Sequence, residues 1–399
     1  MRKHFKTFLF AALTCSLLLG AGISAEAASK IRIDDTNFAW AVKEYAVEAD
    51  TNDDGYLSKK EASKIKEVHF ASSLNIDSLK GLEYFKDIRE FSYRADYAST
   101  DYEDRNIYEN STVSAIDLNG FKKLKEVTVK SSNPYLKSVA LRNCPALEKV
   151  TIEGWKEEDT IDHVILDGCR NLRTVSCWWT NEVKLNLANC KKLTDVTIVG
   201  YQLKKCNLKK CSALRSLWLS SDALTTVKLK GTTKLESATI LGPVQTLDLK
   251  SNKNLKELKC TSAGLTALDL RDCCDLTTLD IRDSKITSLD LKNNKKLKKI
   301  DLRSNKNLSG LNIKGCRKLK ELRIDRSPLT KLNVKKNHDL KKLICEGANL
   351  TKLNLKNNKK LRLLKCIDNN IRSLNLTNTK IKDVSGLECD KDVAVTFAR

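Results

Sequence analysis

The chain repeats one short pattern of apolar and polar residues over most of its length. Residues 286–308 show the pattern in full, with apolar side chains at Ile286, Leu289, Leu291, Leu297, Ile300, Leu302 and Leu308. The first strand position of this pattern recurs in steps of 20 to 22 residues, at Leu185, Cys206, Val227, Leu247, Leu268, Leu289, Leu311, Leu332, Leu353 and Leu374.

A fixed period of about 21 residues is the signature of a solenoid, in which each turn of the chain stacks on the one before. Each apolar-x-apolar triplet places two side chains on one face of an extended segment and one on the other. A single turn cannot bury its own leucines, whereas stacked turns share one continuous core. We therefore predict an α/β repeat protein with short parallel strands on both faces of the coil, spaced about 4.8 Å apart.

The first residues are typical of a targeting signal. Arg2, Lys3 and Lys6 precede an apolar run from Phe8 to Ile23, and small residues follow. This order is that of a secretory signal peptide, which we assign to residues 1–27. No other long apolar stretch follows, so we expect a secreted, extracellular protein, at most loosely associated with the wall, and no membrane span.

Residues 50–61, DTNDDGYLSKKE, fit the EF-hand loop template, in which oxygen ligands recur at fixed positions and a glycine permits a sharp turn. The predicted calcium ligands are Asp50, Asn52, Asp54, Tyr56 (through its carbonyl), Ser58 and Glu61. The alternative is a turn rich in Asp and Asn that binds no metal. Sensor EF-hands work in pairs, and this loop is single, so we interpret it as a calcium-stiffened cap over the first turn of the coil.

The chain then divides into four segments. The signal peptide (1–27) precedes a helical, EF-hand-like N-terminal cap at residues 28–66, a repeat array at 67–374 and a C-terminal cap at 375–399. A polar, tyrosine-bearing insertion at residues 92–112 interrupts the period. Insertions in solenoids lie on one face and often bind partners, although a tolerated surface loop is an equal alternative.

Equivalent positions of successive turns form columns of side chains. The column three residues after the second strand leucine holds Cys144, Cys169, Cys190, Cys211, Thr232, Asn252, Cys273, Asn294, Cys316, Asn337 and Asn358. Such a column points inward and satisfies backbone groups of the loops. In-register neighbours point in parallel directions, which suits a disulfide poorly, so we expect mostly reduced, buried thiols.

An outward column of cations follows the first strand. Its members are Lys209, Lys230, Lys250, Arg271, Lys292, Lys314, Lys335 and Lys356. Such a lysine row could bind a polyanion such as teichoic acid or an acidic glycan by steering and counterion release. The alternative is a solvated face that keeps the protein soluble, which the predominance of Lys over Arg favours.

The outward positions of the second strand change character along the chain. An aromatic and apolar group occupies the middle turns, at Trp178, Trp179, Val199, Tyr201, Trp218 and Leu241. Clustered exposed aromatics indicate a contact surface, so this group is the leading candidate for binding a protein partner. The alternative for Trp179 is that it tucks into a bent strand edge.

Catalysis is not expected. The nearest approach to a grouped set of carboxylates is Asp280, Asp301 and Asp325, but arginines at 282, 303 and 323 interleave with them as ion pairs do. We expect a non-enzymatic, monomeric binding protein with calcium as its cofactor, a protein partner at a host or bacterial surface, and no specific nucleic acid.

The repeat at residues 350–376, LTKLNLKNNKKLRLLKCIDNNIRSLNL, resembles the cysteine-containing leucine-rich repeats of the internalin group of secreted Gram-positive surface proteins. The EF-hand-like loop followed by residues 76–85 resembles the start of such arrays in clostridial relatives. The resemblance implies a leucine-rich-repeat solenoid that binds a protein at a host or neighbouring surface. It also implies that the strand at Leu364 and Cys366 lines the binding face, with Trp178 and Trp218 on that face and the lysine row behind.

Overall fold

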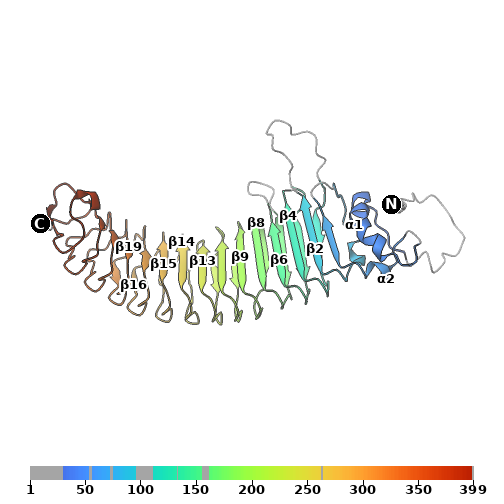
Figure 1. Cartoon of the computed structure of the whole chain (residues 1–399), viewed down its shortest axis with the longest axis horizontal. Helices are drawn as coiled ribbons and strands as arrows, with labels where there is room; N and C mark the ends of the chain where they lie inside the picture. The colour runs from blue at the N-terminus through green and yellow to red at the C-terminus, as the bar shows by residue number, and fades with distance from the viewer. Residues whose placement is uncertain are drawn as a thin grey trace, which may run out of the picture. The chain divides into compact units, whose positions relative to one another are not determined.

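The computed structural model describes residues 30–53, 56–71, 75–95, 111–132, 134–154, 161–261 and 264–397. The expected signal peptide, two loop residues of the EF-hand template (Asp54 and Gly55) and the inner part of the insertion lie outside the described residues. The chain divides into two compact units, Met1–Asn186 and Leu187–Arg399. Each unit is a stack of turns built from parallel strands (Figure 1).

The first unit begins with two helices and continues as strands. Its helices are α1 (Thr36–Ala49), α2 (Lys59–Ala62) and the 3-10 turn η2 (Leu82–Tyr84). Its strands are β1 (Glu67–Phe70), β2 (Glu90–Ala95), β3 (Ala115–Asp117), β4 (Glu126–Ser131), β5 (Ser138–Arg142), β6 (Lys149–Glu153), β7 (Ile161–Asp167) and β8 (Thr174–Leu185).

The strands of the first unit form two parallel ladders. We call the ladder β1–β2–β4–β6–β8 the main sheet of this unit, and its strands pair in register from one turn to the next. The second ladder runs β3–β5–β7 and ends on the later part of β8. The predicted short parallel strands on both faces of the coil and the small N-terminal helix are therefore confirmed.

The N-terminal helix covers the first strand of the main sheet. Phe38 of α1 is fully buried, and its ring contacts Phe70 of β1 edge-to-face at 5.2 Å between centroids. Edge-to-face aromatic pairs stabilise a core beyond the area that they bury. The helix therefore shields apolar side chains that the first turn of a solenoid would otherwise expose.

The expected insertion begins later than the sequence suggests. Strand β2 continues to Ala95, so residues 92–95 pair with β4 as strand. Tyr93 is 1% exposed, and its hydroxyl lies 2.8 Å from the hydroxyl of the buried Ser111. Tyr93 is thus a core residue and does not belong to an exposed tyrosine-bearing loop; its alternation with Phe91 on one face of β2 explains this placement.

The last strand of the first unit turns a corner. Residues 174–178 of β8 pair with β6 in the main sheet, whereas residues 180–185 pair with β7 in the second ladder. Between them, Trp179 has a φ of 57°, a left-handed conformation that bulky residues rarely adopt. The alternative for Trp179, a place at a bent strand edge, is therefore the one observed.

The second unit contains strands and a single short 3-10 turn among its described residues. The strands of its main sheet are β9 (Asp195–Gly200), β11 (Ser216–Ser220), β13 (Ser237–Leu241), β14 (Glu257–Thr261), β15 (Thr278–Arg282), β17 (Lys299–Asp301), β19 (Glu321–Arg323), β20 (Lys342–Ile344), β21 (Leu363–Lys365) and β23 (Leu387–Glu388). The remaining elements are β10 (Lys205–Asn207), β12 (Thr226–Lys228), β16 (Ser288–Asp290), β18 (Gly310–Asn312), β22 (Ser373–Asn375), η3 (Val384–Gly386) and β24 (Ala394–Thr396).

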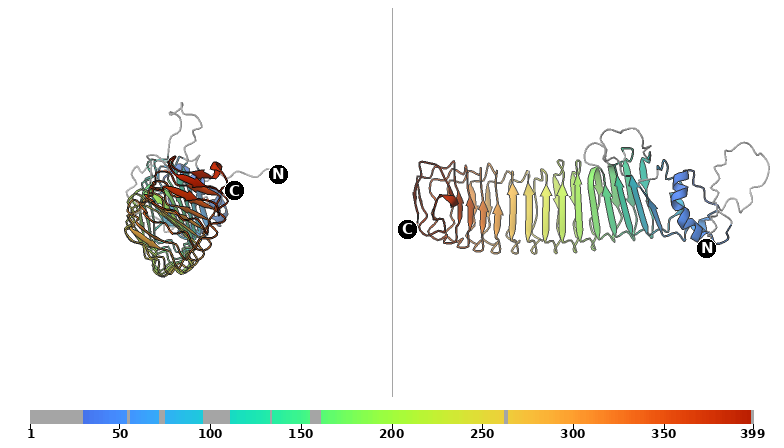
Figure 2. Two further views of the ribbon diagram at one scale, coloured as in Figure 1. Left: turned by 90° about the vertical axis from the view of Figure 1, so that its left-hand side faces the viewer. Right: turned by 45° about the horizontal axis from the view of Figure 1, so that its top comes forward.

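The main-sheet strands of the second unit lie side by side from β9 to β23, as the right-hand view of Figure 2 shows. The opposite side of each turn forms only short pairs, β10–β12, β16–β18 and β22–β24. Strand leucines point inward, and Leu279, Leu322 and Leu364 are fully buried. Full burial of a leucine side chain contributes about 1.5–3 kcal/mol, so the repeated leucines explain why the turns stack.

Candidate functional site

The EF-hand-like loop is closed by its last residue. Glu61 is 5% exposed, and one carboxylate oxygen accepts hydrogen bonds from the backbone and hydroxyl of Thr51, both at 2.9 Å. The other oxygen accepts from the backbone and hydroxyl of Ser58, at 3.0 and 2.9 Å. Ser58 in turn caps the start of α2, so the two residues form a reciprocal capping box. These bonds join the beginning of the loop to its end.

The carboxyl of Glu61 is ionised in this setting. The backbone N–H of Ser58, followed by the Thr51 donors, stabilises the charged form and lowers the pKa of Glu61 to about 2. The Glu61 carboxylate is bonded to Thr51, which stands between Asp50 and Asn52 in the sequence. Carboxylate and amide oxygens are the ligands that calcium prefers. The described residues of the loop therefore supply suitable oxygen donors for a hard cation.

The loop also pairs with the segment that precedes α1. Lys30 and Ser58 form an antiparallel bridge, and the backbone N–H of Ile31 donates to the carbonyl of Leu57 at 2.8 Å. Ile31 and Leu57 are both buried. The strand partner that a second EF-hand would offer is thus replaced by the chain's own N-terminal segment, which holds the loop against the cap.

The aromatic group predicted on the outward strand positions is divided between the two units. In the first unit, Trp178 and Trp179 are half-buried, and the indole N–H of Trp178 donates to the Ser176 hydroxyl at 2.7 Å. Trp179 lies at the corner of β8 and not on the flat part of the sheet. Neither Trp178 nor Trp179 is a fully exposed side chain.

In the second unit the aromatic side chains are more open. Trp218 of β11 is 45% exposed and Tyr201, just after β9, is 41% exposed. Trp218 stands in register between Thr197 and Thr239 on the neighbouring strands, so small side chains flank the indole. Val199 and Leu241 are half-buried on those same strands. We call Val199, Tyr201, Trp218 and Leu241 the aromatic patch.

Every member of the lysine row is exposed, and all lie where the chain turns after the first strand. Except at Lys230, the side chain two positions earlier holds the backbone of each member. Asn354, for example, accepts from the N–H of Lys356 at 3.1 Å, and Asp248 accepts from that of Lys250 at 3.1 Å. The alternation of Asn or Asp with a cation is therefore first a turn signal, because Asx side chains bond the backbone two residues on.

The charges of the lysine row are only partly neutralised. Arg271 pairs with Asp269 at 2.7 Å and Lys292 pairs with Asp290 at 3.2 Å. Within the described ranges, the other members form no ion pair: Lys209, Lys230, Lys250, Lys314, Lys335 and Lys356. Towards the end of the row, asparagine replaces aspartate at the capping position, as at Asn333 and Asn354, which removes the neutralising charge.

Two of the three carboxylates on the later strands are engaged by arginines, as the sequence suggested, whereas the third pairing is wrong, because Arg323 binds Glu321 at 2.8 Å and not Asp325. Arg282 binds Asp280 at 2.7 Å, and Arg303 binds Asp301 through two nitrogens. Asp325 is half-buried beside Glu346, and burial raises its pKa above the ordinary value. Bidentate pairing with arginine fixes these groups in place. The face they form is a self-neutralised, polar surface.

The predicted inward column is confirmed as a ladder that serves the backbone. Cys144 donates to the carbonyl of Leu118 at 3.1 Å, and the side-chain amide of Asn337 donates to the carbonyls of Ile313 and Cys316 at 3.1 and 2.8 Å. The described cysteines are free thiols, and all but Cys274 and Cys389 are buried. Desolvation raises the pKa of Cys177 and Cys260 to about 12, so these thiols stay protonated and unreactive at neutral pH.

A second inward ladder escaped the sequence reasoning. Asn305 donates to the carbonyls of Ile281 and Leu302, both at 2.7 Å, and Asn369 donates to those of Cys345 and Cys366 at 2.8 and 2.9 Å. Ser327 fills the equivalent place between them, with a bond to Leu302. The signal was present, since Ser284, Asn305, Ser327 and Asn369 each stand three residues after a strand residue of the second phrase.

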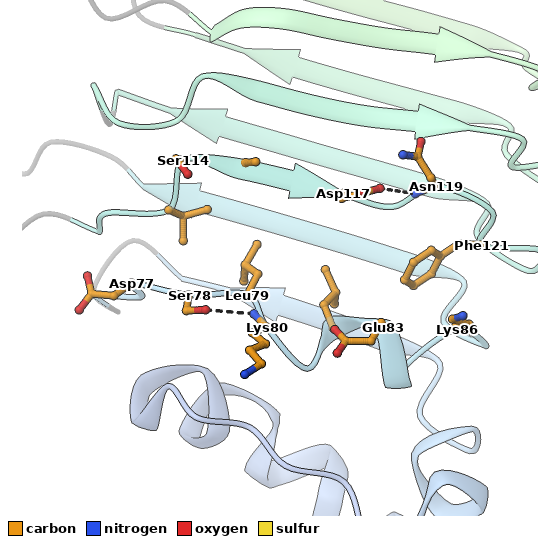
Figure 3. Close-up of a pocket in the computed structure, with 13 residues that line it drawn as sticks. Asp77, Ser78, Leu79, Lys80, Glu83, Lys86, Ser114, Asp117, Asn119 and Phe121 are labelled. Atoms are coloured by element: carbon orange, nitrogen blue, oxygen red, sulfur yellow. Dashed lines mark hydrogen bonds between the residues drawn. The ribbon is translucent and has the colours of Figure 1, made fainter. Parts of the chain in front are cut away.

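One cavity of about 440 Å³ lies in the first unit, between residues 77–86 and the segment that holds β3 (Figure 3). Most of its charged lining groups are already engaged, and Lys86 stands apart as a single cation. Lys80 pairs with Asp34 at 3.2 Å, Glu83 accepts from the Gly81 N–H, and Asp117 accepts from the Asn119 N–H at 2.9 Å. The lining therefore presents no convergent set of free polar groups, and we assign no ligand to it.

Comparisons with known proteins agree with this architecture. Residues 57–173 and 95–215 match the family model of the BspA type leucine rich repeat region. No curated protein matches the sequence significantly. The functional domain of InlJ from Listeria monocytogenes, described as including a cysteine ladder, is 18% identical, covers 85% of this chain and 75% of its own, and has a TM-score of 0.53.

An internalin (inlF) from the same organism is 17% identical, with 92% of this chain and 96% of that chain covered and a TM-score of 0.44. At 18% identity the InlJ structure bears on the fold alone. The repeat match, the parallel-strand coil and the cysteine ladder agree with one another. The chain therefore has a leucine-rich-repeat fold like that of the InlJ domain, and its residues 57–215 carry the BspA type repeat.

Proposed function

We propose that the protein binds a protein partner at a host or bacterial surface through the outward face of the main sheet of its second unit, without catalysing a reaction. The observation that carries the proposal is the exposure of Trp218 and Tyr201, at 45% and 41%, on a rigid sheet. Tryptophan and tyrosine are enriched among the residues that contribute most to binding, because they offer a large contact area and lose little conformational entropy.

The surroundings of the aromatic patch support this use. Thr197 and Thr239, the in-register neighbours of Trp218, are small, and Val199 and Leu241 extend the apolar area. The arginines further along the sheet are bound to their own carboxylates, so they would form a polar rim and not a charged anchor. An apolar centre with a polar rim is the usual anatomy of a protein interface.

Capture of partners from surface extracts tests this function. The full mature chain would be immobilised and compared with the Trp218→Ala and Tyr201→Ala variants, and bound proteins would be identified by mass spectrometry. The matched control is Trp40→Ala, because Trp40 is 64% exposed but lies on α1 in the other unit. We expect that one protein captured by the natural chain is no longer captured by Trp218→Ala but is still captured by Trp40→Ala. Equal capture by all variants would contradict the proposal.

A second candidate function is binding of an anionic wall polymer or acidic glycan along the lysine row. It is favoured by the exposed cations that lack an ion pair, above all Lys314, Lys335 and Lys356. Purified teichoic acid would be the probe, with the triple change of these residues to Gln. The control is the triple change of Lys298, Lys320 and Lys341 to Gln, since these lysines are also exposed and stand at another position of successive turns, six residues after members of the row.

Electrostatic binding to the row weakens as salt rises, whereas apolar contacts at the aromatic patch tolerate salt. Loss of teichoic acid binding with the row variant and not with the control would support this candidate. Equal loss with both would show that the polymer responds to net charge alone.

For the N-terminal cap we propose that calcium binds the EF-hand-like loop through Asp50, Asn52, Asp54, the Tyr56 carbonyl, Ser58 and Glu61. The ionised and buried Glu61 carboxylate supports this assignment. When bound, the ion would neutralise the carboxylates of the loop and join its two ends, as the hydrogen bonds of Glu61 to Thr51 and Ser58 already do. Calcium is plentiful outside cells, so even a weak site of this kind is filled there.

We also propose that the protein is exported and acts outside the cell as a monomer. The amino-acid pattern of residues 1–27 supports export. In the described part of the chain, no helix combines the length and the apolar composition that crossing a membrane requires. Cell fractionation with an antibody to the chain would test this location.

A further inference from the structure

Three side chains with metal-ligating atoms meet on the outward face of the first two strands of the main sheet. Glu67 and His69 stand on β1, and Glu90 stands on β2. One ligand atom from each lies within 4.8 Å of the other two, and among the described residues this is the one such group of three. The sheet register places Glu67 directly opposite Glu90, while the alternation of β1 puts His69 on the same face.

The backbone beneath these residues is rigid. Between them, Val68 points into the core and is fully buried, and Phe91 follows Glu90 with 1% exposure. The Phe70 ring contacts that of Phe91 at 5.9 Å between centroids. Ligands carried by packed strands keep their relative positions better than ligands on loops, so the arrangement is preorganised.

The two carboxylates of this group lack an ion pair with Lys or Arg among the described residues. Like charges directly opposite on neighbouring strands destabilise a sheet. The next glutamate in the column, Glu126, is neutralised by Lys149 at 2.6 Å. Among the described residues, however, no lysine or arginine pairs with Glu67 or Glu90, and the imidazole of His69 lies 3.5 Å from Glu67.

We propose that Glu67, His69 and Glu90 bind a divalent transition-metal ion, with zinc as the best fit. An imidazole nitrogen with two carboxylates suits zinc, whereas calcium and magnesium prefer oxygen ligands alone. Zinc ligands at about 2.0–2.1 Å from the metal lie roughly 3.3 Å from one another, so small rotations of these exposed side chains close the site. Three protein ligands leave one position for water or for a donor group of another molecule.

This site differs in chemistry from the EF-hand-like loop, which offers oxygen donors alone. The two metals can therefore be separated by saturating the loop with calcium before zinc is added. Thiols compete for zinc, and Cys274 is exposed, so the test is made in the Cys274→Ser background.

Isothermal titration calorimetry of the full mature chain with zinc chloride tests the proposal. We expect one equivalent of zinc to bind, and His69→Ala to weaken that binding at least tenfold without lowering Tm. The matched control is His163→Ala, because His163 is also exposed and lies 3.2 Å from one glutamate, Glu182, in the second ladder of the same unit. Among the described residues, no second carboxylate completes a group of three there. Zinc binding that is unchanged in His69→Ala would overturn the proposal.

The carboxylates require their own variants. Glu67→Gln and Glu90→Gln keep the side-chain shape and remove the charge, so each should also weaken zinc binding; full affinity in both would leave histidine alone as ligand and overturn the three-residue site. Cobalt provides an independent reading. The absorption spectrum of Co²⁺ bound in place of zinc should show only weak visible bands if its ligands are nitrogen and oxygen. An intense near-ultraviolet charge-transfer band would place the metal on thiols and contradict the assignment.

Discussion

The side-chain amide of Asn294 donates a hydrogen bond to the backbone carbonyl of Cys273, 21 residues earlier in the chain, at 2.8 Å. A second bond from the same amide reaches the carbonyl of Leu270 at 2.9 Å. Both acceptors belong to the preceding turn of the coil. One inward polar side chain thus fixes the spacing of two turns, and its repetition along the chain explains why so polar a sequence stacks regularly.

Replacement of Asn294 by alanine should lower stability by about 1–3 kcal/mol, because it removes two buried hydrogen bonds. The carbonyls of Leu270 and Cys273 each keep one backbone donor, the N–H of Cys273 and that of Leu276. The neighbouring Asn293 provides the control, since Asn293→Ala removes the same amide group at a position where the side chain is exposed to solvent. Thermal and urea unfolding of both variants measure the difference. Equal effects of the two substitutions would contradict a ladder role for Asn294.

Thiol labelling of the native protein should be confined to the surface. Cys274 is exposed, whereas Cys260 and Cys366 are buried with pKa values raised to about 12 by desolvation, so they offer almost no thiolate at neutral pH. A chromogenic disulfide reagent should therefore label Cys274 rapidly and Cys389 more slowly. In denaturant the remaining cysteines should react as well; a deficit there would reveal disulfides.

The hydrogen bonds of Glu61 predict an acid-sensitive cap. Its pKa falls from 4.5 to about 2 on folding, so its stabilising contribution is complete above about pH 4.5 and is lost as the pH falls towards 2. At about 1.4 kcal/mol per pKa unit, the contribution is at most about 3 kcal/mol. Glu61→Gln should therefore destabilise the protein at pH 7 and flatten the decline of stability below pH 4.5. The measurement is urea unfolding as a function of pH.

Calcium should raise Tm through the loop, and Asp50→Asn is the clean variant for testing this. Glu61 is unsuitable, since its bonds to Thr51 and Ser58 stabilise the cap without any metal. We expect calcium to raise the Tm of the natural protein more than that of Asp50→Asn, and a chelator to remove the difference. An equal calcium response in both proteins would refute the loop as the binding site.

Much of the fold could be predicted from the sequence because residues that are one period apart in the chain lie side by side on neighbouring turns of the coil. The period of about 21 residues placed Cys206 opposite Val227 and Leu289 opposite Leu311, and both pairings are present. The inward ladder followed from the same reasoning. A small polar side chain that recurs three residues after a strand leucine is expected to point inward and to hydrogen-bond the backbone groups of the buried loop.

Where the period fails, the sequence was less informative. The step from β1 to β2 contains an irregular segment, so the register that brings Glu67 opposite Glu90 could not be derived by counting. Tyr93 looked like part of a tyrosine-bearing loop because the end of β2 carries no apolar repeat beyond it. Exposure along an outward column also depends on neighbours on adjacent strands, which explains why Trp218 is open whereas Trp178 is half-buried against Ser176.

The most direct measurement of the central claim is the affinity of the captured protein partner for the natural chain, for Trp218→Ala and for Trp40→Ala. A central aromatic anchor contributes about 2 kcal/mol or more, so Trp218→Ala should weaken binding roughly thirtyfold or more, while Trp40→Ala should leave Kd unchanged. An unchanged Kd for Trp218→Ala, in a variant that unfolds at the same temperature as the natural chain, would contradict a binding face centred on the aromatic patch.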